Sequence, residues 1–337
     1  MKNINILDCT LREGGYVNNW DFGYENIRNI ITNLTLAGVE YIEGGFLKQE
    51  NHSQDMSIFS NIYEFTELIS KENSDTIYTL MINYGEYNIS LLPDCPEKNI
   101  GIRIAFKKDE QESAIEYCRQ IKAKGYKVFV NPMHSFSYSS AEFLDIIEKV
   151  NDLLPYALTI VDTTGSMKEK DIVSLFYLTD GNLDKNIALA FHSHNGQQLS
   201  FTNSQSIMKT NRNRELIIDS TVFGIGRGSG NICTELITQY INDNYNGSYN
   251  IPYIFQIVDN QIKPIYEKTP WGYSVPYYLA ATNNCHPNYA KFLNDKRLSA
   301  QTITRIFNQI PDNKKTNYDM ELIRELYLNC TSDKILK

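Results

Sequence analysis

The feature of this sequence that most constrains its fold is a regular alternation of short apolar runs with segments of helical periodicity. Helical patterns at 24–36, 58–70, 110–124, 141–153 and 170–178 separate most of the runs, and the connection around 87–92 is weak. Strands that alternate with helices are parallel and joined by right-handed crossovers. Eight such units over about 240 residues predict an α/β fold, a closed (β/α)8 TIM barrel. The eight runs with the character of buried strands are 4–7, 39–42, 77–82, 100–106, 127–130, 158–161, 187–191 and 216–218.

An open, doubly wound sheet is the alternative fold for this alternation. The sequence has no GxGxxG after the first run and no GxxxxGK[ST] anywhere, so the usual nucleotide-binding signals of such sheets are missing. Beyond residue 245 the alternation stops, and helical patterns at 253–266, 276–283, 300–309 and 319–328 predict a C-terminal helical annex. We therefore expect a barrel domain over residues 1–245 and a helical domain over residues 246–337.

Composition narrows the class of protein further. The 337 residues include 32 basic and 40 acidic side chains, a net charge of -8, so there is no excess positive charge to attract nucleic acid or an anionic membrane. No apolar run approaches the roughly 18 residues of a membrane-spanning helix, and the N-terminus has a strand-like pattern instead of a signal sequence. The six cysteines are scattered without a CxxC pair. We expect a cytoplasmic protein with reduced thiols that binds neither nucleic acid nor membrane.

The most informative local pattern is HSHN, which places His192 and His194 at the end of the seventh run. Residues two apart in a strand lie on the same face, so both imidazoles would point to one side. In a barrel that side is the carboxyl-terminal mouth, where barrel enzymes have their active sites. Two neutral imidazoles form a good half of a divalent-metal site. The alternative is a chance pair of histidines, one of which caps a loop.

A second group of polar residues follows the first run, in the segment DCTLREGG at residues 8–15. Glu13 is the best candidate for the anionic ligand that a metal with two histidines requires. Arg12 supplies planar donors suited to a carboxylate or to an enolate oxygen, and Gly14 and Gly15 let the backbone bend close to a ligand. Alternatively, Arg12 and Glu13 form an ordinary ion pair on a loop.

Polar residues also follow the sixth and eighth runs. The segment DTTG at 162–165 contains good helix N-caps, so capping is the alternative to ligand binding there. The segment GRGSGN at 226–231 is glycine-rich and precedes a helix, so its amides could hold an anion, although it lacks the lysine of a true P-loop. Asn231 could instead offer its amide oxygen to the metal.

Five motifs resemble, in sequence and in order, those of the DRE-TIM metallolyase (HMGL-like) superfamily: DCTLREGG, VEYIEGG, VDTTG, HSHN and GIGRGSGN. The resemblance covers about residues 4–245. The superfamily includes hydroxymethylglutaryl-CoA lyase, isopropylmalate and homocitrate synthases and the 4-hydroxy-2-oxovalerate aldolases. It implies that Glu13, His192 and His194 bind a divalent metal, with Asn231 or water nearby. Most members have Asp where this chain has Glu13, whereas homocitrate synthases have Glu.

The same resemblance implies roles for further residues. Arg12 would neutralise the enolate oxygen of a bound 2-oxo acid or thioester. Glu43 would orient this arginine, and Thr163 or Thr164 would bind the substrate carboxylate. We count Arg103, in the fourth run, as a further substrate-binding candidate.

Within the superfamily the chain is most similar to the aldolase branch, through GIGRGSGN and the annex segment WGYSVPYY. Tyr273 or Tyr277 would be the counterpart of the aldolase tyrosine that closes over the active site. The aldolases carry a catalytic histidine three residues after the acidic ligand, where this chain has Tyr16. The general base is therefore open between Tyr16, acting through water, and His286 from the annex. Val222 stands where hydroxymethylglutaryl-CoA lyase has its cysteine, so that activity is not expected.

We therefore expect a divalent-metal-dependent aldolase that forms or cleaves a 4-hydroxy-2-oxo acid through a pyruvate-type enolate. Mn²⁺ or Mg²⁺ is favoured, and Zn²⁺ or Co²⁺ is the alternative. The family has members in surface-polysaccharide gene clusters, so a sugar-derived aldehyde is one candidate acceptor. Besides the 2-oxo acid and the aldehyde, the expected partners are further copies of the chain and, through the annex, a dehydrogenase. The alternatives are an acyl-CoA-dependent condensing synthase of the homocitrate or isopropylmalate type and a catalytically inactive binding barrel.

Overall fold

The expected barrel is present in the computed structural model, which describes residues 3–50, 52–69, 75–211 and 213–332. Eight parallel strands are hydrogen-bonded in the order β1-β9-β8-β7-β6-β5-β4-β2, and β2 pairs back to β1 and closes the barrel. All eight predicted strands are therefore confirmed. They are β1 (Ile4–Asp8), β2 (Tyr41–Leu47), β4 (Ile77–Asn83), β5 (Ile100–Phe106), β6 (Lys127–Pro132), β7 (Ala157–Asp162), β8 (Ala188–Ser193) and β9 (Leu216–Ser220).

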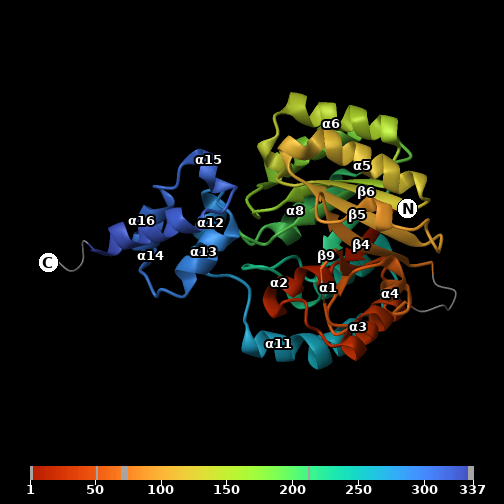
Figure 1. Ribbon diagram of the computed structural model, residues 1–337, viewed down its shortest axis with the longest axis horizontal. Helices are drawn as coiled ribbons and strands as arrows, with labels where there is room; N and C mark the ends of the chain where they lie inside the picture. The colour runs from red at the N-terminus through yellow and green to blue at the C-terminus, as the bar shows by residue number, and fades with distance from the viewer. Residues whose placement is uncertain (1–2, 51, 70–74, 212, 333–337) are drawn as a thin grey trace.

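Helices surround the barrel (Figure 1). Two short helices, α1 (Thr10–Glu13) and α2 (Gly15–Asn18), follow β1 directly. The longer helices of the barrel are α3 (Tyr24–Leu36), α5 (Gln111–Ala123), α6 (Ser140–Leu153), α7 (Glu169–Asn182), α8 (Ser200–Thr210) and α9 (Thr234–Tyr245).

The helix predicted over residues 58–70 is wrong in its first part. Strand β3 (Ile58–Phe59) pairs in parallel with the end of β2. Helix α4 (Ile62–Thr66) begins only after Asn61, whose side chain accepts hydrogen bonds from two backbone N–H groups of the first turn. A strand of two residues has no periodicity of its own, so the apolar pattern of the helix hid it. Residue 70 lies outside the described residues. The weak connection around 87–92 contains a single 3₁₀ turn, Ile89–Leu91.

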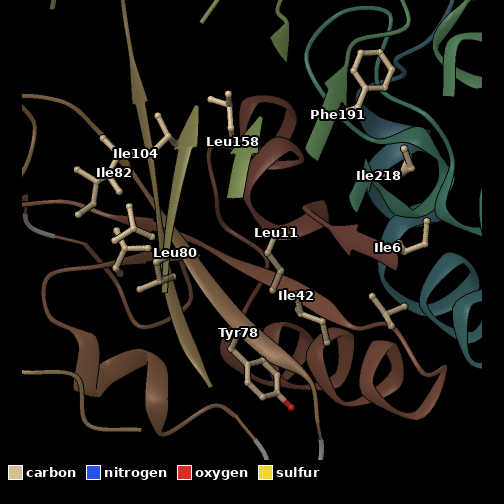
Figure 2. Packing of buried hydrophobic residues seen from close by; sticks show 14 of the residues in the cluster. Ile6, Leu11, Ile42, Tyr78, Leu80, Ile82, Ile104, Leu158, Phe191 and Ile218 are labelled. Carbon is tan, nitrogen blue, oxygen red and sulfur yellow. The ribbon is translucent and has the colours of Figure 1, made fainter. Parts of the chain in front are cut away.

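Side chains alternate along each strand between the outer apolar core, under the helices, and the interior of the barrel. Figure 2 shows outward-facing side chains of the main apolar core, including Ile6, Ile42, Leu80, Ile104 and Phe191. On the inner side, the residues nearer the amino ends are mostly apolar, and two positions further along the same strands they are polar or ionisable. The inward pairs are Tyr41 and Glu43, Gly101 and Arg103, Phe129 and Asn131, Ala190 and His192, and Ile217 and Asp219.

The C-terminal segment is helical, as predicted. Its helices are α10 (Ile251–Ile257), α11 (Lys263–Lys268), α12 (Val275–Thr282), α13 (Pro287–Asn294), α14 (Ala300–Phe307), α15 (Asp312–Lys315) and α16 (Met320–Ser332), with a π-helical turn (Val258–Ile262) between the first two. Helices α12 to α16 stand beside the barrel (Figure 1). Across the described ranges, every helix is too short or too polar to cross a membrane.

The two apolar cores divide later along the chain than residue 245. Tyr249, Ile254 and Ile262 pack into the core of the barrel. The separate core of the annex includes Tyr289 and Ile306 and begins at Ala280. The segment around α10 and α11 is therefore part of the wall of the barrel, and the independent annex consists of α12 to α16.

Candidate active site

One carboxylate and two imidazoles meet inside the carboxyl-terminal mouth of the barrel. His192 and His194 project from the end of β8, and their rings are 5.1 Å apart between centroids. Glu13 Oε1 lies 3.4 Å from His192 Nε2, and Glu13 Oε2 lies 3.4 Å from His194 Nε2. The three potential ligand atoms lie within 4.8 Å of one another. The structure thus brings together the three side chains that the sequence predicts as metal ligands.

The position of Glu13 follows from the turn that ends β1. The Asp8 carboxylate accepts hydrogen bonds from the backbone N–H of Thr10 at 2.9 Å and from the hydroxyl of Thr234 at 2.6 Å. Burial raises the pKa of Asp8 to about 6, and these hydrogen bonds oppose the shift. The contacts hold α1 across the mouth of the barrel, so that Arg12 and Glu13 point inward.

A closed ring of ionisable side chains supports the two groups. Arg12 pairs with Glu13 and donates through Nε to Glu43 at 2.7 Å. On the other side of Glu43, Arg103 lies 3.2 Å from the carboxylate and also pairs with Asp219. Asp219 accepts a hydrogen bond at 3.0 Å from Nδ1 of His192, which faces Glu13 and so completes the ring. Each charged group in this buried ring contacts a group of opposite charge or a histidine.

The charges of the ring favour a bound cation. Its three carboxylates outnumber its two guanidinium groups by one. Burial opposes ionisation of Glu13, but Arg12 and His194 outweigh it and hold the pKa of Glu13 well below its usual value. Because His192 donates Nδ1–H to Asp219, Nε2 of the neutral ring presents a lone pair to the Glu13 carboxylate. A cation, either a proton or a metal ion, must lie between these two groups.

Further observations fit a divalent metal at this point. The Asn231 side chain donates through Nδ2 to the carbonyl of Ile225, and its buried Oδ1 has no partner in the described chain. A side chain at Gly226 would come within 2.2 Å of Asn231 Nδ2 and 3.4 Å of Glu13 Oε2, so only glycine leaves this space open. One carboxylate, two imidazoles and an amide oxygen form a donor set suited to Mn²⁺, Mg²⁺ or Zn²⁺.

A second potential metal group, formed by Cys9, His192 and Asp219, is less suitable. Burial raises the pKa of Cys9 well above its usual value, which keeps it a thiol, and Sγ donates to the carbonyl of Ser220 at 3.2 Å. Asp219 is already paired with Arg103. The Glu13 group is therefore the candidate metal centre.

A cavity of about 890 Å³ opens above the candidate metal centre. Its floor includes Arg12, Glu13 and Arg103, and its walls come from the loops after β4, β5 and β6. The annex contributes one side through residues 286–287 and 316–318. The lining includes four of the five histidines in the chain, namely His134, His192, His194 and His286. The site is therefore shared by the barrel and the annex.

The other predicted site residues divide into two groups. Tyr16 and Thr163 line the cavity, and Glu43 lies directly behind Arg12. Thr164 does not line it, and its hydroxyl instead pairs with that of Ser166 at 2.8 Å. Asp162 accepts hydrogen bonds from the backbone N–H groups of residues 166 and 167, which lie in the loop before helix α7. The N-cap of α7 is Lys168, so Asp162 stabilises the turn after β7 and the capping alternative for DTTG is wrong.

The two annex tyrosines also differ in position. The side chain of Tyr273 is 61% exposed and does not line the cavity. Tyr277 is partly buried and packs against the backbone of Gly228, where an added Cβ would lie 2.6 Å from its ring. Of the two, Tyr277 is the one in contact with the glycine-rich loop of the site.

The proton-transfer candidates have definite states at neutral pH. Burial raises the pKa of Tyr16 above its usual value, so it is a neutral phenol. Burial, together with Arg227, His134 and His194, lowers the pKa of His286 to about 3, so it is a neutral imidazole. Its Nδ1 accepts the backbone N–H of Asn288 at 3.2 Å, which leaves the ring proton on Nε2. His286 is thus arranged to donate a hydrogen bond and not to accept a proton.

Sequence reasoning missed two functional candidates, Asp219 and His134. Asp219 follows the predicted strand 216–218 by one residue, and continuing the alternation of that strand would have placed it inward. His134 has a left-handed backbone (φ 53°), and its backbone N–H donates to the Thr163 hydroxyl at 2.9 Å. Burial and His194 lower its pKa to about 4. A loop residue of this kind has no periodic signal in the sequence. Its position after β6, at the mouth of the barrel, is the one feature that could have indicated a functional role.

Comparison with known proteins agrees with this geometry. An HMGL-like family model matches residues 3–251. A 4-hydroxy-2-oxovalerate aldolase from Geobacillus genomosp. 3 is 25% identical over 244 residues, which cover 71% of this chain and 70% of the relative. An oxaloacetate decarboxylase from Mycobacterium tuberculosis is 22% identical over 234 residues, which cover 69% of this chain and 68% of the relative.

Solved structures show the same fold. The N-terminal domain of a candidate aldolase from Bacteroides vulgatus superposes with a TM-score of 0.73 and 26% identity, covering 89% of this chain and 99% of that one. HMG-CoA lyase from Bacillus subtilis superposes with a TM-score of 0.64 and 14% identity, covering 80% of this chain and 94% of the lyase.

Proposed function

The chain belongs to the HMGL-like family, and from this premise we propose that it is a divalent-metal-dependent aldolase, a carbon–carbon lyase acting on a 4-hydroxy-2-oxo acid. The observation that carries the proposal is the buried group of Glu13, His192 and His194, with Arg12 beside it, on the floor of a cavity large enough for two substrates. The relatives named as 4-hydroxy-2-oxovalerate aldolases support the reaction class.

The donor substrate would be a 2-oxo acid such as pyruvate. A divalent ion held by Glu13, His192, His194 and Asn231 would supply Lewis acidity toward its carbonyl and carboxylate oxygens. Arg12 commits Nε to Glu43 and Nη1 to Glu13, which leaves Nη2 for the substrate. A guanidinium fixed in this way stabilises negative charge on an enolate oxygen without having to reorganise.

The protons would move through neutral side chains. The Tyr16 phenol, which lines the cavity, can donate a proton to the aldehyde oxygen when the carbon–carbon bond forms. The lone pair of His286 already accepts the N–H of Asn288, so His134, the remaining cavity imidazole outside the metal group, is the better candidate to accept a proton. Thr163 orients His134 by accepting its backbone N–H.

The acceptor would be larger than acetaldehyde. The cavity of about 890 Å³ is near the upper end of ordinary small-ligand sites. Its outer wall carries hydrogen-bonding groups from Asn83, Glu86 and Asp109, which suit a hydroxylated chain. We propose a sugar-derived aldehyde, and with it a role in surface-polysaccharide synthesis.

Proton exchange at the methyl group of pyruvate tests the proposal. The protein is incubated with pyruvate in D₂O and followed by NMR with Mn²⁺ or Mg²⁺, with chelator, and without aldehyde. We expect metal-dependent exchange in the wild type and loss of both exchange and bound metal in His192→Ala. The matched control is His52→Ala, since His52 contacts Glu64 at 3.2 Å and is the one histidine that does not line the cavity. Absence of exchange with every metal would contradict the proposal and favour an acyl-CoA donor or a binding role.

A further inference from the structure

Of the three arginines that line the cavity, one has no counterion among the described residues. Arg12 and Arg103 each contact two carboxylates. Arg227 also lines the cavity, but in the described residues no carboxylate lies within ion-pair distance of its guanidinium. The group lies over the ring of Tyr16, 4.0 Å from the ring centroid. This cation–π contact stabilises the guanidinium over the ring, and its N–H groups have no anionic acceptor among the described residues.

The neighbour of Arg227 is a second hydrogen-bond donor. Arg227 Nη1 lies 3.4 Å from Nε2 of His286. A neutral imidazole has one acceptor nitrogen, and the N–H of Asn288 lies nearer to Nδ1, at 3.2 Å, than Arg227 lies to Nε2, so we assign the ring proton to Nε2. Both facing nitrogens therefore present hydrogens, and neither can accept from the other. Two donors this close are stabilised when an oxygen with lone pairs is bound by both.

The loop that carries Arg227 is held in place from the annex side. The N–H of Gly272 donates to the carbonyl of Gly228 at 2.9 Å, and Tyr277 packs on the same glycine. Gly228 has a φ of +64°, which suits glycine and lets the chain turn tightly after Arg227. Since His286 also begins an annex helix, the barrel and the annex hold the two donors at a fixed separation.

We propose that Arg227 and His286 form an anion-binding subsite for a carboxylate or phosphoryl group. A bound oxygen anion would neutralise the unpaired guanidinium and accept from both donors, and such charge-assisted bonds are about twice as strong as neutral ones. The assignment of this anion to the acceptor aldehyde rests on the proposed function, in which Arg12 and the metal centre take the 2-oxo acid. The acceptor would then be an aldehyde that carries an acidic group.

Titration with simple anions tests the subsite without requiring turnover. Inorganic phosphate and acetate are titrated into the full-length protein at constant ionic strength, and binding is followed by calorimetry. We expect Arg227→Gln to weaken binding by about tenfold or more, and Arg227→Lys to retain part of it because the charge remains. His286→Asn removes the Nε2 donor but keeps an acceptor for the N–H of Asn288, so it should preserve helix α13 and still weaken binding.

The control is Lys107→Gln, which removes a positive charge from the cavity wall without altering either donor. Equal weakening by Lys107→Gln would overturn the proposal, because binding would then reflect diffuse charge. So would the absence of binding in the wild type, or unchanged affinity in both Arg227→Gln and His286→Asn. The relative affinities for phosphate and acetate identify the acidic group. Anion binding without pyruvate exchange would support the subsite and refute the aldolase proposal. Pyruvate exchange without anion binding would support the aldolase proposal and refute the subsite.

Discussion

Asp219→Asn is the substitution that most directly tests the ring of ionisable side chains beneath the candidate metal centre. Asparagine has the same shape, but it lowers the number of carboxylates in the ring from three to two and balances the two guanidinium groups. It also replaces the anion that accepts Nδ1–H of His192 at 3.0 Å. Loss of such an outer partner typically weakens metal binding by about 10–100-fold, or about 1.4–2.7 kcal/mol. We expect the dissociation constant for Mn²⁺ to rise by this factor.

The measurement is a calorimetric titration of Mn²⁺ into chelator-treated protein. The control, Glu235→Gln, removes another buried carboxylate, which accepts the backbone N–H of Phe223 at 3.0 Å and does not belong to the ring. In metal-free protein, Asp219→Asn should lower the free energy of unfolding by only about 1–3 kcal/mol, because Arg103 keeps Glu43 at 3.2 Å and Asn131 at 3.3 Å. Mn²⁺ affinity equal to that of the wild type, or an equal loss in Glu235→Gln, would refute the reasoning.

Three further predictions concern other parts of the site. Arg12→Lys keeps the charge, but a lysine cannot bridge Glu13 and Glu43 as Arg12 does. Metal-dependent pyruvate exchange, measured by NMR, should therefore slow by about 100-fold or more. An exchange rate within about threefold of the wild type would contradict this. The pKa of His134 is lowered to about 4 from 6.5, so the unfolded chain takes up the proton first and this group destabilises the fold as pH falls from about 6.5 to about 4. Relative to His134→Gln, the wild type should lose up to about 3 kcal/mol between pH 7 and pH 4 in urea unfolding with chelator present, and a constant difference would be inconsistent with the shift. Gly228→Ala forces an alanine into a φ of +64° with its Cβ 2.6 Å from the Tyr277 ring, and should lower the free energy of unfolding by about 1–3 kcal/mol; an unaltered melting temperature would speak against that contact.

The parts of the fold that follow a local period could be predicted from the sequence. The eight strands alternate with helices, and the pair His192 and His194 follows the strand period of two, so both the barrel and the shared face were predictable. Glu13 could be predicted because an end of β1 next to two glycines is a natural place for a ligand. The barrel follows from alternation along the whole chain, whereas each of these three ligand candidates can be inferred from the composition of a single strand end.

The parts that depend on which loops meet could not be predicted in the same way. The ring requires Glu43 from β2 and Asp219 from β9 to contact the same Arg103, and no single segment carries that information. Tyr273 and Tyr277 are equivalent in sequence terms, but packing of α12 leaves the first exposed and places the second on the glycine-rich loop. Such choices are made by tertiary contacts.

The glycine-rich loop 226–230 belongs to both halves of the molecule. At Gly226 the missing side chain leaves space for Glu13 and Asn231. At Gly228 the loop packs against the ring of Tyr277, and its carbonyl accepts a hydrogen bond from the N–H of Gly272. The annex is therefore not a module that can be exchanged without a change in this loop. A different annex would need a matching loop, and a change in that loop would reach the candidate metal group within two residues, so we expect the annex and the loop to vary together among relatives.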